Sequence, residues 1–152
     1  MARWIALLLP LALILGALGS QYLGGLHPCE MCHWQRWPHY AAIPLALLAF
    51  IVPGRPLQLL LVLLAGLAIG ISGAIGVFHA GVEYHWWQGI TPCTAPIVAG
   101  GDILAQIQNR PLVRCDRAQW ELLGISLAGF NALLSLAGAL AILVAAPWKD
   151  RR

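Results

Sequence analysis

Hydrophobic residues gather in four long runs along this chain, and most polar residues fall between them. A helix that crosses a bilayer needs about 20 mainly apolar residues, and hydrocarbon offers no partner to an unpaired backbone amide, so such runs predict spanning helices. The four predicted spans cover residues 4–23, 37–52, 57–78 and 122–146. The second is short and contains Pro44, but interfacial aromatic residues flank it. We therefore expect an all-α membrane protein, a single bundle of four transmembrane helices.

The first run has an alternative interpretation as a cleaved signal peptide. Ala17, Leu18 and Gly19 form a passable small-residue cleavage site. The apolar run is nevertheless long for a signal, and Arg3 is its only basic flank. We therefore expect it to be the first span.

The connections between the predicted spans are very unequal. Residues 53–56 form a tight Pro-Gly-Arg-Pro turn, whereas the predicted outer loops cover residues 24–36 and 79–121. In a four-helix chain those two longer loops lie on the same face of the membrane. Tracks of small residues predict close helix packing. They are Gly66, Gly70 and Gly73 in the third span and Ser126, Gly129 and Ser135 in the fourth.

Composition agrees with a lipid environment. The chain is 60% hydrophobic and 10% charged, whereas soluble domains carry about 25% charged residues. Its formal net charge of +3 is too small and too scattered to suggest nucleic-acid binding. Basic residues are denser at the termini and the tight turn than in the longer loops. The positive-inside rule then predicts cytoplasmic termini and external longer loops.

All four cysteines lie in the two longer loops. Cys29 and Cys32 fall in the first loop, and Cys93 and Cys115 fall in the second. Helix counting therefore places them in one compartment, which by the predicted orientation is the oxidising one, where disulfides persist. The sequence leaves their pairing open.

The spacing of Cys29 and Cys32 favours a redox-active pair. A C-x-x-C spacing lets two sulfurs exchange partners and lowers the pKa of one thiol. The pair sits where the second helix begins, at the positive end of its dipole, and Arg36 lies one turn after Cys32 on the same face. A cation there would stabilise a Cys32 thiolate, although Arg36 could also be an interfacial snorkelling residue. Inert structural disulfides and a metal site remain alternatives.

Residues 29–33, Cys-Glu-Met-Cys-His, also match the attachment signature of a c-type haem. Both sulfurs would then bind haem, and His33 would be the axial ligand. That interpretation leaves Cys93 and Cys115 without a role, and the loop is short for enclosing a haem. A membrane cytochrome is therefore the alternative to thiol chemistry.

Two motifs resemble those of the DsbB family, also called disulfide bond formation protein B. Residues 29–36, CEMCHWQR, resemble the family's C-x-x-C-x-x-Q-R, and residues 115–120, CDRAQW, resemble the segment that carries its last cysteine. The resemblance covers nearly the whole chain. Vitamin K epoxide reductase homologues have a similar bundle, but the Gln35-Arg36 match favours the DsbB family.

The resemblance implies a thiol:quinone oxidoreductase that works as a relay. A reduced periplasmic thiol oxidase of the DsbA kind would attack Cys93, and the Cys93–Cys115 disulfide would take its electrons. They would pass to Cys29–Cys32 and then to ubiquinone or menaquinone in the bacterial inner membrane. The quinone-site residues would be Cys32, Arg36 and His79, and no metal is implied. His79 could instead be an interfacial histidine at the outer end of the third helix. As a departure from the family, the stretch between Cys93 and Cys115 is short, and residues 103–107 within it predict an amphipathic surface helix.

Overall fold

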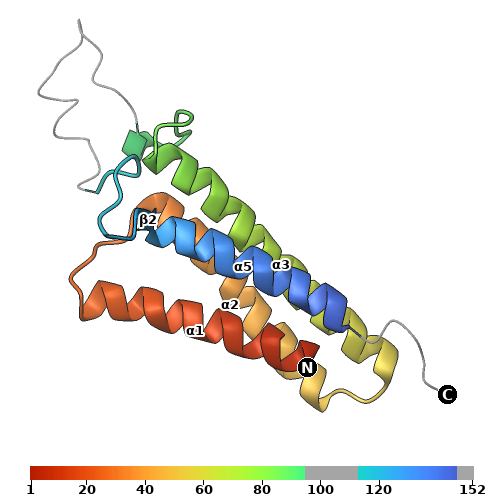
Figure 1. The fold of residues 1–152 in the computed structure, drawn as a ribbon. Coiled ribbons are helices and arrows are strands. Elements are labelled where there is room, and N and C mark those ends of the chain that lie inside the picture. Colours follow the sequence, from red (N-terminus) through yellow and green to blue (C-terminus); the bar gives the residue numbers. More distant parts are fainter. Residues whose placement is uncertain (95–112, 147–152) are drawn as a thin grey trace, which may run out of the picture.

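The computed structural model describes residues 1–94 and 113–146. Its long helices are α1 (Ala2–Tyr22), α2 (Glu30–Ile51), α3 (Arg55–Glu83) and α5 (Leu127–Ala145). They lie lengthwise beside one another, with the start of α1, the α2–α3 turn and the end of α5 at one end of the bundle (Figure 1). The other ends of these helices meet at the opposite end, called here the cysteine end. The expected all-α four-helix bundle is confirmed.

Within the described part of the chain, α1, α3 and α5 are each long and apolar enough to cross a membrane. Large apolar side chains such as Leu15, Leu67 and Leu140 are exposed on the bundle's surface. In a bilayer these side chains would contact lipid. The helix α2 does not meet the same criterion because polar residues occupy its first half, and several of them are buried inside the bundle.

The second helix begins earlier than the predicted span of 37–52. Cys29 caps it, and its Sγ accepts a hydrogen bond from the Cys32 backbone nitrogen at 3.2 Å. Residues 30–36, expected in the first outer loop, are therefore helical. Hydropathy concealed this start, because the polar Gln35 and His39 are buried against other helices rather than facing water. The third helix likewise continues to Glu83, beyond the predicted end at 78.

The predicted fourth span starts with a hairpin instead of a helix. Strands β1 (Glu121–Leu122) and β2 (Ile125–Ser126) pair antiparallel. The turn between them, at Leu123 and Gly124, has φ values of 54° and 75°, which are typical of the type I′ turn that joins short hairpins. Ser126 then caps α5 by accepting a hydrogen bond from the Gly129 nitrogen at 3.1 Å.

Close packing between α3 and α5 is confirmed. A Cβ added at Gly73 would lie 2.9 Å from Leu136 Cγ, and one at Gly76 would lie 3.0 Å from the Ala132 nitrogen. The two serines of the fourth-span track also make hydrogen bonds: Ser126 caps α5 from the end of β2, and Ser135 on α5 donates a hydrogen bond to Asn131. The predicted surface helix at 103–107 and the C-terminal basic residues lie outside the described residues.

Candidate functional site

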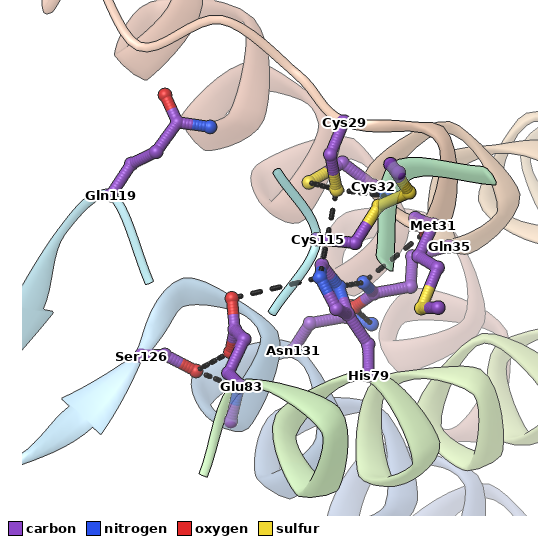
Figure 2. Close-up of polar contacts among 12 residues, drawn as sticks. Cys29, Met31, Cys32, Gln35, His79, Glu83, Cys115, Gln119, Ser126 and Asn131 are labelled. Atoms are coloured by element: carbon purple, nitrogen blue, oxygen red, sulfur yellow. Dashed lines mark hydrogen bonds and ion pairs between the residues drawn. A yellow bond between two sulfur atoms is a disulfide. The ribbon is translucent and has the colours of Figure 1, made fainter. Parts of the chain in front are cut away.

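Both cysteine pairs meet at the cysteine end of the bundle. Cys93, on the short 3-10 turn Pro92–Thr94, forms a disulfide with Cys115. Cys29 and Cys32 are free, with their Sγ atoms 2.7 Å apart. All four belong to one buried cluster, and Figure 2 shows Cys115 beside the Cys29 and Cys32 side chains. The fold therefore brings the two pairs into reach of each other.

The start of α2 presents hydrogen-bond donors to the free pair. Cys29 Sγ accepts from the Cys32 backbone nitrogen and lies 3.5 Å from His79 Nε2. These groups and the helix dipole stabilise negative charge on sulfur. Cys29 receives the backbone and imidazole contacts. Its own contact with Cys32, together with the Arg36 cation, lowers the pKa of the Cys32 thiol, which agrees with the stabilised Cys32 thiolate predicted from the sequence. The two sulfurs are so close that charge on one disfavours charge on the other.

Arg36 lies on α2 and reaches across to the end of α1. Its Nη1 donates to Gln21 Oε1 at 2.6 Å, and its Nη2 donates to the Ala17 carbonyl at 3.3 Å. The side chain also lines the same small cavity as Cys32. Both roles considered for Arg36, a site cation and an anchor near the membrane surface, agree with this placement.

His79 is 1% exposed, so it lies in the interior of the bundle rather than at its surface. Gln35 Nε2 is 2.7 Å from its Nδ1, and Glu83 Oε1 is 3.6 Å from its Nε2. Ser126 donates a hydrogen bond to the other oxygen of Glu83. Sequence reasoning did not single out Glu83, although its position one helical turn after His79 was an available signal.

The cavity beside the free pair has a volume of about 50 Å³. Polar groups suited to a quinone face it, since Arg36 and His79 supply N–H donors, and the apolar wall includes Leu26, Trp120 and Leu127. The residue types therefore fit a quinone head group. The volume suits only a few water molecules, so binding a ring there requires these side chains to move apart.

The outer disulfide has its own polar neighbour, which the sequence did not reveal. Thr91 is buried, and its Oγ1 lies 2.8 Å from Cys93 Sγ and 3.9 Å from Cys115 Sγ. Next to it is a cavity of about 740 Å³, lined by Trp86, Trp87 and other loop residues. At its rim Arg114 pairs with Asp116, and the guanidinium holds the pKa of that carboxyl below its usual range.

The metal and haem alternatives can be placed as well. The ligand atoms of Cys29, Cys32 and His79 all lie within 4.8 Å of one another, the distances that a metal ion would need. His33, the candidate haem ligand, is exposed on α2. Distance alone therefore leaves a metal possible at the free pair, and the protonation of His79 decides whether its nitrogen could be a ligand.

Comparisons with known proteins identify relatives over most of the chain. The family model "Disulfide bond formation protein DsbB" matches residues 1–145. A disulfide bond formation protein B of Polaromonas sp. is 33% identical over 144 residues, covering 88% of this chain and 82% of the relative. One from Verminephrobacter eiseniae is 30% identical over 136 residues, covering 80% and 71%. An uncharacterised protein of Rickettsia prowazekii is 26% identical over 122 residues, covering 77% and 70%. No solved structure matches the chain significantly.

Proposed function

Because the chain belongs to the DsbB family of membrane thiol:quinone oxidoreductases, we propose that it reoxidises a DsbA-like dithiol protein and passes the electrons to ubiquinone or menaquinone. The observation that carries this proposal is that a disulfide, Cys93–Cys115, and a free pair, Cys29 and Cys32, pack in one buried cluster. A relay needs two such pairs within exchange distance. Purely structural staples would have no need of a free pair beside them.

The outer pair performs the first exchange. A thiolate of the partner attacks Cys93 Sγ, a mixed disulfide forms, and Cys115 leaves as a thiolate. The partner's second thiol then breaks the mixed disulfide, so the partner departs oxidised and Cys93 and Cys115 hold the electrons. Thr91 Oγ1, close to Cys93 Sγ, is placed to donate a hydrogen bond to sulfur as it becomes negative.

The inner exchange follows the same chemistry. The Cys115 thiolate attacks the oxidised Cys29–Cys32 pair, and Cys93 resolves the resulting mixed disulfide. This step restores Cys93–Cys115 and leaves Cys29 and Cys32 as thiols.

To become a disulfide again, the Cys29–Cys32 dithiol must lose two electrons and two protons, and a quinone held beside the pair would supply the acceptor. Arg36 and His79 would hold the quinone oxygen by donating hydrogen bonds to it, and the apolar wall would exclude water. We propose that this end of the bundle faces the periplasm of a bacterial cell and that both termini are cytoplasmic. The oxidising compartment is then the one where the partner works.

Two variants test the order of the relay. Cys93→Ala should abolish reaction with the reduced partner while Cys29 and Cys32 still respond to quinone. Cys32→Ser should leave the outer exchange possible and stop quinone reduction. The measurement is quinone reduction by the reduced partner, together with a non-reducing mass map of each variant. If both variants keep full activity, the cysteines have only a structural role. A haem mass on the Cys29–Cys32 peptide would favour the cytochrome alternative.

A further inference from the structure

A polar cluster crosses the bundle beneath the free cysteine pair and joins three helices. It lies among apolar neighbours, and its side chains are mostly buried. Its members are Gln35 and His39 on α2, Ser72 and His79 on α3, and Asn131 and Ser135 on α5. Because each buried donor must meet an acceptor, the contacts determine which group donates and which accepts in each hydrogen bond.

The backbone sets the direction at Asn131. Its Nδ2 lies 3.2 Å from the Ser72 carbonyl oxygen, and a carbonyl can only accept. The amide nitrogen of Asn131 must therefore face α3, and its Oδ1 faces the other way. There Oδ1 accepts from His39 Nε2 at 3.0 Å and from Ser135 Oγ at 3.1 Å.

The same reasoning determines the orientation of the Gln35 side-chain amide. Asn131 Nδ2 donates to Gln35 Oε1 at 2.8 Å, so Gln35 Nε2 is on the opposite side of its amide. A second carbonyl agrees, because Gln35 Nε2 lies 3.4 Å from the Met31 oxygen. Gln35 therefore donates from Nε2 to His79 Nδ1 at 2.7 Å. A neutral imidazole has one N–H, so the proton of His79 resides on Nε2.

We propose that Gln35, oriented by Asn131, is a positioning residue that holds His79 in the Nε2–H form. The proton is thereby directed at Cys29 Sγ, 3.5 Å away, and at Glu83 Oε1, 3.6 Å away. This inference rests on the proposed function, in which negative charge develops on sulfur and on the quinone oxygen at this point. A donor at Nε2 stabilises that charge, whereas a lone pair there would repel it.

The same protonation state protects the dithiol from metal capture. Cys29, Cys32 and His79 satisfy the distances for a metal site, but a metal needs the lone pair of His79 Nε2. To make that lone pair available, the proton of His79 would have to move from Nε2 to Nδ1, where it would clash with the hydrogens of the Gln35 amide. Gln35 would then have to rotate its amide against both Asn131 and the Met31 carbonyl. The cluster therefore favours the proton over the metal at His79 Nε2.

The direct test is the protonation of His79 in the full chain. Histidine labelled with ¹⁵N is incorporated, the protein is reconstituted in lipid nanodiscs, and ring signals are recorded at a pH where imidazole is neutral. The His79→Gln spectrum identifies the signals. We expect a protonated Nε2 and a bare Nδ1, and a proton on Nδ1 would overturn the proposal.

Gln35→Glu provides the matched perturbation. A carboxylate has the same shape as the amide but accepts at both oxygens, so His79 should move its proton to Nδ1 and free Nε2. The reduced variant should bind Co²⁺, followed by thiolate-to-metal absorption, roughly 10–100-fold more tightly than the unmodified protein, the size of other outer-shell effects. Gln58→Glu adds the same charge at the far end of α3, where Gln58 donates to the Val52 carbonyl, and should change neither readout.

Equal Co²⁺ affinity in Gln35→Glu and the unmodified protein would contradict the proposal. If Gln35→Glu does not fold, the ¹⁵N spectrum of the unmodified protein decides alone. Neither readout requires turnover. A protonated Nε2 in a protein that fails to reduce quinone would leave this inference standing and remove the proposed function.

Discussion

Replacing Arg36 tests the proposed electrostatics of the quinone site. Its guanidinium uses separate nitrogens to bind Gln21 Oε1 and the Ala17 carbonyl, at 2.6 and 3.3 Å, and still lines the cavity beside Cys32. The fork is therefore held in place by α1. A cation fixed in this way can stabilise charge at the cavity without reorganising during the reaction.

The magnitude follows from the kind of contact that is lost. A hydrogen bond to a charged group contributes about 1.5–3 kcal/mol, and about 1.4 kcal/mol corresponds to a tenfold change in rate. Arg36→Ala should therefore lower quinone affinity or turnover roughly ten- to a hundredfold. Arg36→Lys should recover only part of this loss, because an ammonium lacks the planar fork that serves Gln21, Ala17 and the cavity together.

The assay is quinone reduction by the reduced partner, measured across concentrations of a short-chain quinone. Arg3→Lys is the control matched to Arg36→Lys. Arg3 Nη1 also donates a hydrogen bond to a backbone carbonyl, but that carbonyl belongs to Ala49, near the end of α2 that is remote from the cysteines. The control should keep normal kinetics. If Arg36→Ala equals the unmodified protein at limiting quinone while remaining folded, Arg36 is only an anchor at the membrane surface, and the electrostatic reasoning is refuted.

Three further outcomes are expected. A membrane-impermeant thiol reagent, added to intact cells after reduction, should label all four cysteines, and labelling only after lysis would reverse the proposed orientation. Thr91→Val should slow exchange at Cys93 roughly tenfold in stopped-flow measurements, because the hydroxyl 2.8 Å from Cys93 Sγ is lost; an unchanged rate would remove Thr91 from the mechanism. Gly76→Ala should destabilise the bundle by about 1–3 kcal/mol, because the added Cβ would lie 3.0 Å from the Ala132 nitrogen. Gly16→Ala is the control, because a Cβ added there has no atom within 4 Å. Equal melting temperatures for these two variants would contradict the packing argument.

Local patterns in the sequence were sufficient for the architecture and the chemistry. Apolar runs of spanning length predict helices because lipid demands internal hydrogen bonds. The short Pro-Gly-Arg-Pro turn and the two longer connections then place all cysteines at one end. Each of the two motifs, one around Cys29 and one around Cys115, spans only a few consecutive residues, so their resemblance to the DsbB family was readable without coordinates.

Tertiary structure decided what depends on partners far apart in the sequence. The start of α2 was hidden because Gln35 and His39, polar by composition, are satisfied by residues of α3 and α5. The hairpin before α5 depends on the positive φ angles of Leu123 and Gly124, and an apolar run in the sequence does not predict such angles. The protonation of His79 depends on Asn131, 96 positions beyond Gln35. No local pattern encodes a hydrogen bond between helices, because its direction is set only when the folded backbone supplies the fixed acceptors.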